Sequence, residues 1–438
     1  MERLISAFGL LAMVAIAWAM SEDRTKVPWR VVGWGLVLQL LLGLAVLSPA
    51  VQELFFAVVD SSVRRLLSFG ESGAQFVFQS VRPHTITLAD GSVETFVGRI
   101  SPPVQTFAFW ILPTIVFFSS LTAVGYHTGV LQVVVRGMAN VMRVTMGTSG
   151  AETLSTAANV LLGQTEAPLL VKPFVATMTR SELFCVMLGG FSNTAGSVLG
   201  AYVGFLHDIP GIAGHLVTSS ILSAPATLVI AKVMVPEREV PVTSGATPAD
   251  APKIDRNLME AAARGATEGM ALAINVAAML IAFIALTAML DACLAVVPVS
   301  ICEGTPVGGW VEGCGPLSMA TVLGWVFFPL ALLMGVPWQD AGTVGVLLGE
   351  KIVLTEFIAY AHLGDLLKVD GALSPRSAVI ASYALCGFAN FASVGIQIGG
   401  IGAMAPNRTA DLAEIGLKAM VGGSLATFMT ACVAGILL

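Results

Sequence analysis

Hydrophobic residues fill long segments of the chain, and polar residues gather in the stretches between them. Five of the clearest apolar segments are Leu4–Met20, Val31–Leu47, Phe107–Val124, Ile212–Val235 and Met270–Val297. Each is within or above the range of about 17 to 25 apolar residues that a helix needs to cross a bilayer. The pattern therefore predicts several membrane-spanning helices.

The composition favours helices throughout. Of the 438 residues, 56% are hydrophobic and only 11% are charged, whereas about a quarter of the residues of a soluble domain are charged. The 45 glycines and 18 methionines suit closely packed helices better than the strands of a β-barrel, in which apolar residues would alternate over about 10 residues. We therefore expect an all-α polytopic membrane protein.

Basic residues in the connections predict how the chain is oriented. Cytoplasmic connections are enriched in Lys and Arg, and the connections that would face the cytoplasm carry Arg24, Lys26, Arg30, Arg136, Arg143, Lys232, Arg238, Lys253, Arg256 and Arg408. The alternate connections, residues 207–211 and 298–318, contain no Lys or Arg. They are expected outside, together with both termini. Residues 52–100 also fall outside although they carry four arginines, and we interpret them as a surface helix and loop.

Two cysteines and the net charge add little to this picture. Cys302 and Cys314 lie in the long outer connection, where either a disulfide or two free thiols would be consistent with the sequence. The net charge of −6 is spread along the chain without a long block of one sign. It indicates no nucleic-acid partner.

The two halves of the chain contain an internal repeat. Thr165-Glu166 is followed by GFSNTAGSVLGAY at residues 190–202, and Thr355-Glu356 is followed by GFANFASVGIQIGG at residues 387–400. In this frame Glu166 matches Glu356, and Asn193 matches Asn390. Agreement of residue type, order and approximate spacing is improbable by chance, although the spacing differs somewhat between the halves.

Each Thr-Glu pair interrupts an apolar segment. In the first half Ala151–Leu162 leads into Gly163, a polar triplet and a proline, and Leu169–Val175 then resumes the apolar run. Neither arm can span a bilayer at 1.5 Å per residue, so a re-entrant helical hairpin fits better. Ala341–Leu363 is the counterpart in the second half. Paired broken segments indicate a transporter binding site, because unwound backbone inside a membrane is tolerated where it lines a cavity.

The carboxylates of these hairpins are the first candidates for that site. A carboxylate in the middle of a bilayer costs at least about 2.5 kcal/mol, so such a residue usually faces a polar cavity. A structural alternative is that Glu166 pairs with Lys172 or Lys351 between helices. Asn159, Asn193 and Asn390 could likewise serve as interhelical hydrogen-bonding residues. We interpret Lys172, Glu350 and Lys351 as structural or gating pairs.

Four segments resemble the signatures of the concentrative nucleoside transporters: GQTEAPLLVKPF, GGFSNTAGSVLGAY, TEFIAY and CGFANFASVGIQIGGIGAMAPNR. They recur in the family's order from about residue 103 to the C-terminus, and the first hundred residues agree in hydrophobic layout alone. The resemblance implies about eight transmembrane helices, two opposed re-entrant hairpins, an inverted repeat in the transport domain and a homotrimer. It also implies a multi-pass protein of the inner membrane that imports nucleosides such as uridine, coupled to a cation, by alternating access.

The resemblance also suggests how the chain is divided. Residues 1–102 would form N-terminal scaffold helices and a surface segment, and 103–148 a third span with an interfacial helix. The first transport half would be 149–235, followed by a cytoplasmic linker at 236–256. A long scaffold helix, outer loop and outer helix would occupy 257–335, and the second transport half 336–438.

Site residues follow from the same resemblance. The nucleobase would be recognised at the first hairpin tip by Gln164, Thr165 and Glu166, with Val198 packed beside it. The ribose hydroxyls would be bound by Glu356, Asn390 and Ser393, with Phe388 lining the pocket. Amide and carboxylate groups supply the donors and acceptors that such a ligand requires.

The resemblance further implies a sodium site between the first hairpin tip and the next helix. Its ligands would be Asn159 and Asn193 together with the backbone carbonyls of Leu162 and Thr194, which are the oxygen ligands that hard cations prefer. The family often has Ser or Thr where this chain has Asn193. Proton coupling through Glu166 or Glu356 is therefore an alternative, because a desolvated carboxylate can take up a proton. No cofactor is expected beside the coupling ion.

Other classes of protein fit the sequence less well. The chain lacks His-Glu-x-x-His, Cys-x-x-Cys and Gly-x-Ser-x-Gly, so we expect that it is not an enzyme. A channel, or a carrier for another small polar solute, would share the broken helices. An open pore, however, does not require carboxylates in two repeated hairpins.

Overall fold

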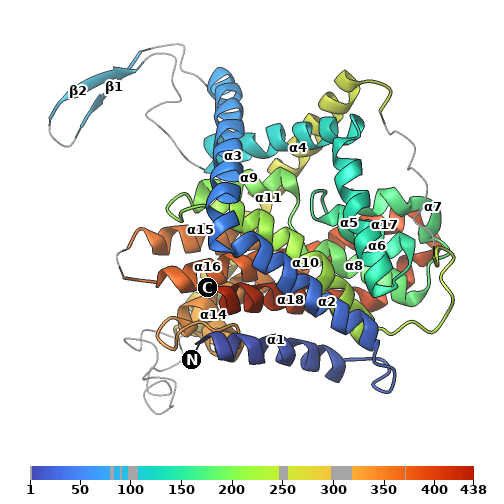
Figure 1. The fold of residues 1–438 in the computed structure, drawn as a ribbon. Coiled ribbons are helices and arrows are strands. Elements are labelled where there is room, and N and C mark those ends of the chain that lie inside the picture. Colours follow the sequence, from blue (N-terminus) through green and yellow to red (C-terminus); the bar gives the residue numbers. More distant parts are fainter. Residues whose placement is uncertain are drawn as a thin grey trace.

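The computed structural model describes residues 2–78, 83–88, 91–96, 107–245, 255–296, 318–369 and 371–438. Nearly all of the regular structure is helical, as predicted (Figure 1). The N-terminal part contains α1 (Glu2–Ala19), α2 (Trp29–Leu47), α3 (Pro49–Phe78), the π-helical turn η1 (Phe107–Ile111), α4 (Leu112–His127) and α5 (Val130–Met146). Cys302 and Cys314 lie outside the described residues.

The elements of the first half are repeated in the second half. In the first half they are α6 (Gly150–Asn159), η2 (Ala167–Val171), α7 (Lys172–Val175), α8 (Arg180–Ser192), α9 (Gly196–Phe205) and α10 (Ile212–Met234). After α11 (Leu258–Leu294) and α13 (Met319–Leu333), the second half has α14 (Ala341–Val353), α15 (Glu356–Leu367), α16 (Pro375–Leu385), α17 (Phe391–Met404), η3 (Pro406–Arg408) and α18 (Thr409–Leu437). Each half thus has a helical hairpin, an interrupted helix pair and one long helix.

The two hairpin interruptions fall where the sequence predicted them, and the structure adds two further breaks. The first hairpin is broken between α6 and η2, at residues 160–166, and the second between α14 and α15, at residues 354–355. Residues 193–195 separate α8 from α9, and residues 386–390 separate α16 from α17. The second arm of the first hairpin covers the expected residues 169–175 but is irregular, because a 3₁₀ turn precedes the single α-helical turn of α7. Pro168 and Pro173 lie in it, and each removes a backbone donor that a continuous helix would use.

Two capping boxes fix the start of α6 and of α8. Ser149 and Thr179 accept from the backbone N–H groups of Glu152 and Glu182, whose carboxylates accept from the N–H of the cap residue in return. This arrangement satisfies donors that a helix N-terminus otherwise leaves free. Because Ser149 also donates to Glu182, the first hairpin and the following helix are held together at their base.

The number of spans is close to the expected one. Within the described residues, six helices are long and apolar enough to cross a membrane, or seven if the bent pair α4 and α5 is one span. The interrupted pair α8 and α9 is counted as one of them, whereas the pair α16 and α17 is not. The expected total of eight remains a prediction.

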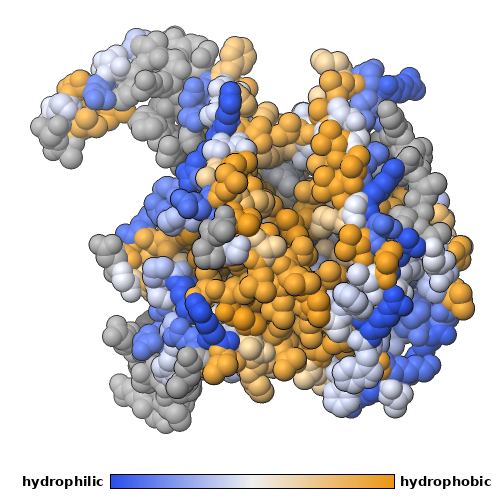
Figure 2. All heavy atoms as spheres, in the orientation of Figure 1, coloured by the Kyte–Doolittle hydropathy of each residue, from blue (hydrophilic) through white to orange (hydrophobic). Residues whose placement is uncertain are grey.

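Apolar side chains form a broad band between two more hydrophilic edges of the molecule (Figure 2). Phe8, Leu11 and Leu41 on α1 and α2 are each more than half exposed. A membrane helix presents such a surface to lipid, whereas a soluble protein rarely leaves a large contiguous apolar patch uncovered. The fold is therefore that of a polytopic membrane protein.

Four arginines that were predicted to face the cytoplasm connect segments that are distant in the sequence. Their hydrogen bonds join separate connections: Arg30 to Val144 O, Arg143 to Gly245 O, Arg238 to Glu22 O, and Arg408 to Met178 O. The two termini lie side by side (Figure 1), where Arg3 donates to Leu438 O at 2.6 Å. This arrangement is consistent with all of these basic connections lying on the same side of the membrane. Which side faces the cytoplasm remains a prediction.

Three segments differ in detail from the sequence-based picture. The segment expected as a surface helix and loop contains the long α3 followed by an antiparallel pair of strands, β1 (His84–Thr87) and β2 (Val93–Phe96). Helix α11 begins twelve residues earlier than its apolar run at Met270, because Asn257 caps it by accepting from Glu260 N. Part of the linker is held in place, since Thr243 accepts from the N–H groups of Gly150 and Ala151.

Candidate functional site

One cavity of about 340 Å³ lies where the interruptions meet. Both hairpin tips, the start of α9, the start of α17 and one face of α11 line it. All eight residues that were expected to bind substrate are among its lining residues: Gln164, Thr165, Glu166, Val198, Glu356, Phe388, Asn390 and Ser393. Residues nearly 230 positions apart in the chain are thereby brought together. Cavities of roughly 300 to 1,000 Å³ accommodate small-molecule ligands.

The tip of the first hairpin is a tight turn that holds Glu166. The backbone N–H of Glu166 donates to Gly163 O at 3.1 Å, and its carboxylate accepts from Gly163 N at 3.3 Å. The side chain is only half-buried. The turn thus presents a carboxylate and its neighbouring polar side chains to the cavity without a helical backbone around them.

Glu356 lies at the corresponding tip of the second hairpin. It is the first residue of α15 and only 3% exposed. Its two oxygens accept from different partners, Oε1 from the Tyr202 hydroxyl at 3.0 Å and Oε2 from Asn390 Nδ2 at 2.8 Å. A helix N-terminus also favours a negative charge. The carboxylate is therefore oriented by two donors and keeps acceptor capacity for a ligand.

Asn390 connects that carboxylate to the next helix. Its Nδ2 donates to Glu356, and its Oδ1 accepts from Ser393 N at 2.9 Å, which caps α17. The Ser393 hydroxyl in turn accepts from Gln164 Nε2 at 3.4 Å. One chain of hydrogen bonds thus runs from the second hairpin, through the α16–α17 break, to the first hairpin.

The four candidate sodium ligands are all buried near the first hairpin and the α8–α9 break. Asn159 and Asn193 converge on Gly189, since Asn193 Nδ2 donates to Gly189 O at 3.3 Å and a Cβ added at Gly189 would lie 3.2 Å from Asn159 Nδ2. Asn193 Oδ1 accepts from Ser223. Leu162 and Thr194 lie on the two interrupted segments. The neighbourhood offers neutral oxygens of the type that hard cations prefer.

Glu166 does not pair with Lys172 or Lys351 in this conformation, so the alternative role as a link between helices does not hold. Lys172 is exposed, and the buried ammonium of Lys351 donates to Ala384 O at 2.8 Å and to Thr427 Oγ1 at 2.9 Å. Glu350 pairs with His362 at 3.0 Å rather than with a lysine. The expected lysine–glutamate pairs are therefore absent in the described part of the chain, because the repeat turns these side chains toward different neighbours.

Four further residues at the site were missed by the sequence analysis. Tyr202 binds Glu356, Gln397 Nε2 donates to Gln164 Oε1 at 3.2 Å, and Glu268 and Asn275 line the cavity from α11. A signal for Gln397 was present, because it follows Ser393 by one helical turn in an apolar segment. Glu268 and Asn275 are seven residues apart and so share one helix face.

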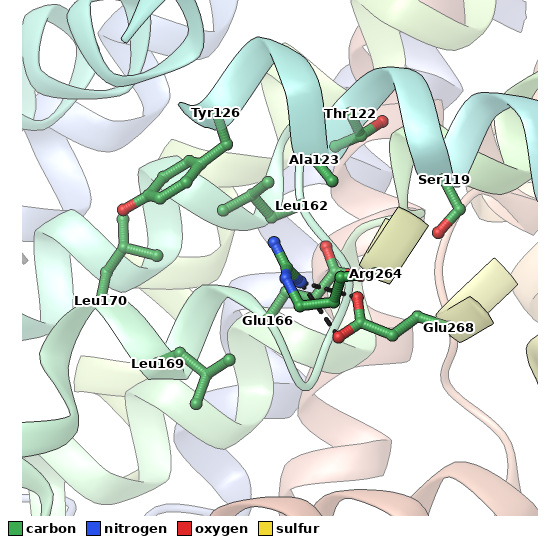
Figure 3. Close-up of a pocket in the computed structure, with 10 residues that line it drawn as sticks. All are labelled: Ser119, Thr122, Ala123, Tyr126, Leu162, Glu166, Leu169, Leu170, Arg264 and Glu268. Carbon is green, nitrogen blue, oxygen red and sulfur yellow. Dashed lines mark hydrogen bonds and ion pairs between the residues drawn. The ribbon is translucent and has the colours of Figure 1, made fainter. Parts of the chain in front are cut away.

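A second cavity, of about 30 Å³, adjoins the first at Glu166 and Glu268 (Figure 3). It lies between the first hairpin, α4 and α11, and it has room for little more than a water molecule. Arg264 lies beside both carboxylates in Figure 3 and forms an ion pair with Glu268 at 2.8 Å. A third cavity, of about 580 Å³, lies between α3 and α4 on one side and α9 and α15 on the other.

Family models match most of the chain. The model described as Na+ dependent nucleoside transporter C-terminus matches residues 215–435, and the corresponding N-terminus model matches residues 8–81. The model described as nucleoside recognition matches residues 108–208. The match at residues 8–81 extends the similarity into a segment that the sequence analysis related to the family by hydrophobic layout alone.

Curated relatives are similar over the whole chain. An uncharacterized transporter of Haemophilus influenzae is 39% identical over 440 residues, which cover 100% of this chain and 98% of that protein. Solute carrier family 28 member 3 of Mus musculus is 38% identical over 453 residues, covering 100% of this chain and 59% of that protein. Sodium/nucleoside cotransporter 1 of Homo sapiens is 38% identical over 457 residues, with 100% and 64% covered. The chain thus spans roughly three fifths of the length of these mammalian relatives.

Solved structures agree with the fold. CNTnw in an inward-facing substrate-bound state has a TM-score of 0.85 and 37% identity, covering 100% of this chain and 98% of that chain. A variant of CNTnw in an outward-facing state has a TM-score of 0.84 over the same shares. The helical bundle, the paired broken helices and the cavity between them are those of a polytopic membrane protein with the fold of CNTnw. The chain belongs to the family of Na+-dependent nucleoside transporters, which are transporters and not enzymes.

Proposed function

We propose that this protein is a sodium-coupled symporter that imports nucleosides by alternating access. The observation that carries the proposal is the single cavity lined by both hairpin tips and both helix breaks. One end of it offers Gln164, Thr165 and Glu166, and the other offers Glu356, Asn390 and Ser393. The family supplies the substrate class, and the two ends supply groups suited to a base and to a sugar.

The polar groups match the two parts of an uncharged nucleoside. A nucleobase edge presents amide-like donors and acceptors, which the first hairpin tip can pair. The ribose presents two neighbouring hydroxyls, and the Glu356 carboxylate can accept from both because each of its oxygens has further lone pairs. Val198 and Phe388 add apolar surface for the flat base and the sugar ring. A buried polar site of this kind disfavours analogues that lack a hydroxyl, since its own groups would be left unpaired.

Sodium coupling is supported by the oxygen-rich neighbourhood of Asn159, Leu162, Asn193 and Thr194. Asn159 and Leu162 lie on the hairpin that carries Gln164 and Glu166, and the other two lie at the α8–α9 break. An ion bound there would therefore stabilise the segment that contacts the substrate. Binding of the ion would then favour binding of the nucleoside, and reciprocally. Proton coupling is the alternative, in which Glu166 or Glu356 would carry the proton.

Alternating access would require the two repeated halves to move against the neighbouring helices. This movement would open the substrate cavity first to one side of the membrane and then to the other. The small cavity adjoins the site on the side of the first hairpin, and the 580 Å³ cavity lies between the same two groups of helices elsewhere. We further propose a homotrimer in the inner membrane, with both termini outside. The exposed apolar faces of α1, α2 and α11 are the surfaces available to lipid and to partner subunits.

The proposal is tested by uptake of labelled uridine into proteoliposomes under separately imposed sodium and proton gradients. A sodium gradient alone is expected to drive saturable accumulation, and a proton gradient alone is expected to leave the internal concentration at equilibrium. Accumulation driven by protons and indifferent to sodium would contradict sodium coupling. Flux that never saturates would indicate a channel, and chemical conversion of the uridine would indicate an enzyme.

A further inference from the structure

Gln397 lies behind the substrate cavity and is hydrogen-bonded to Gln164, which lines it. Its side chain is fully buried on α17 and does not line the cavity. Its Nε2 donates to Gln164 Oε1 at 3.2 Å, while Gln164 Nε2 donates to Ser393 Oγ at 3.4 Å. We propose that Gln397 is a positioning residue that fixes the orientation of the Gln164 amide and thereby sets which nucleobases are preferred. This inference rests on the proposed nucleoside transport and assigns part of its specificity.

The direction of the hydrogen bond between Gln397 and Gln164 determines which nucleobases are preferred. A glutamine amide has an acceptor oxygen and an NH₂ donor, which exchange places when the amide turns over. Because Gln397 occupies the oxygen of Gln164, the amide keeps its NH₂ group on the side of Ser393, which lines the cavity. A ligand at the first hairpin tip therefore meets a donor. Bases with a carbonyl at the recognised edge, as in uridine and inosine, are favoured over bases with an amino group there, as in cytidine and adenosine.

The surroundings of Gln397 support a role that depends on its amide. Its Oε1 is buried and has no hydrogen-bond partner among the described residues. An unpaired buried acceptor destabilises a fold, so an apolar side chain of similar length would suit the packing better. Within the described part of the chain, Gln397 forms a side-chain hydrogen bond with Gln164 and with no other side chain. The Gln397 amide therefore serves to orient Gln164 and does not stabilise α17.

A glycine makes room for this contact. A Cβ added at Gly190 on α8 would lie 2.7 Å from Gln397 Nε2 and 3.0 Å from Gln164 Cβ. Any side chain at that position would compete with the glutamine amide for the same space. Gly190 therefore allows α17 and the first hairpin to approach closely enough for the two glutamines to bond.

The test compares uptake of four labelled nucleosides by the full-length protein in proteoliposomes. The parent protein is expected to prefer uridine over cytidine and inosine over adenosine. In Gln397→Met both preference ratios are expected to fall toward one, by about five- to tenfold, which is the worth of one neutral hydrogen bond. Uptake by Gln397→Met should still require sodium, because the candidate ion ligands lie on other segments. The matched control is Gln39→Met. Gln39 is also buried and donates a hydrogen bond, and its Oε1 has no partner in the described ranges, but it lies on α2.

Coupling between the two glutamines provides the second measurement. If Gln397 acts through Gln164, the double variant Gln164→Ala/Gln397→Met should show the same preference ratios as Gln164→Ala alone. Additive changes would overturn the proposal, and so would unchanged ratios in Gln397→Met. If Gln397→Met does not insert, Gly190→Ala tests the same contact, since its methyl group displaces the amide. A parent protein that prefers cytidine and adenosine also overturns the proposal, whereas a parent that transports no nucleoside contradicts the proposed function instead.

Discussion

Replacing Glu356 with glutamine tests the role of the carboxylate at the second hairpin tip. The change keeps the shape of the side chain and removes its charge and one acceptor. Tyr202 and Asn390 each donate to one oxygen of Glu356. The glutamine can keep its oxygen toward Asn390 and turn its NH₂ toward the Tyr202 hydroxyl, which can accept as well as donate. The fold should therefore tolerate Glu356→Gln, and the loss should fall on the ligand.

The expected loss of uridine affinity follows from the hydrogen bonds that the ribose would lose in Glu356→Gln. A hydrogen bond to a charged group is worth about 1.5 to 3 kcal/mol, and about 1.4 kcal/mol corresponds to a tenfold change in affinity. Losing one such bond lowers uridine affinity about 10- to 150-fold, and losing both is expected to abolish measurable uptake. The assay is sodium-driven uridine uptake together with equilibrium binding of uridine and of its deoxyribose analogues. The advantage of uridine over those analogues should disappear in Glu356→Gln.

A matched control separates this effect from general damage. Glu350→Gln changes a carboxylate on the same hairpin that pairs with His362 and does not line the cavity. It should leave uridine affinity within about twofold of the parent, as expected for a change that touches no ligand contact. Undiminished uridine uptake by a correctly inserted Glu356→Gln protein would refute a role of Glu356 in binding ribose.

Three other substitutions test separate parts of the site. Asn159→Ala removes one expected oxygen ligand, so the sodium concentration for half-maximal uptake should rise about tenfold; an unchanged sodium dependence would remove Asn159 from the ion site. Tyr202→Phe removes one donor to Glu356, so uridine affinity should fall about three- to tenfold without a change in base preference; an altered base preference would contradict its place beside the ribose. Gln164→Ala should change the preference between pyrimidine and purine nucleosides in competition assays, and an unchanged profile would exclude Gln164 from base recognition.

Much of the site could be anticipated because polar residues are conspicuous in apolar segments. The Thr165-Glu166 and Thr355-Glu356 pairs interrupt hydrophobic runs, and such residues remain in a membrane only where the backbone or a cavity accommodates them. Their repetition in the same order, with Asn390 after the second pair, indicated that the two interruptions belong to one arrangement. The structure places these residues around one cavity.

Other contacts depended on tertiary packing and could not be derived from the sequence. Tyr202 lies on a helix whose sequence gives no sign of which neighbour its hydroxyl meets, and that partner proves to be Glu356, more than 150 residues away. Glu268 lines the cavity from α11, which the sequence analysis assigned to the scaffold alone. Gln397 contacts Gln164 because Gly190 leaves space between helices, and a close approach of that kind appears only in the assembled fold.

The central claim is that the two hairpin tips together form one nucleoside site. It is tested most directly by an experimental structure of the protein in a lipid environment with uridine and sodium. The account predicts the base beside Gln164 and Glu166, and the ribose hydroxyls within hydrogen-bonding distance of Glu356 and Asn390. Uridine bound elsewhere, or held by one hairpin with the other turned away from it, would contradict the account.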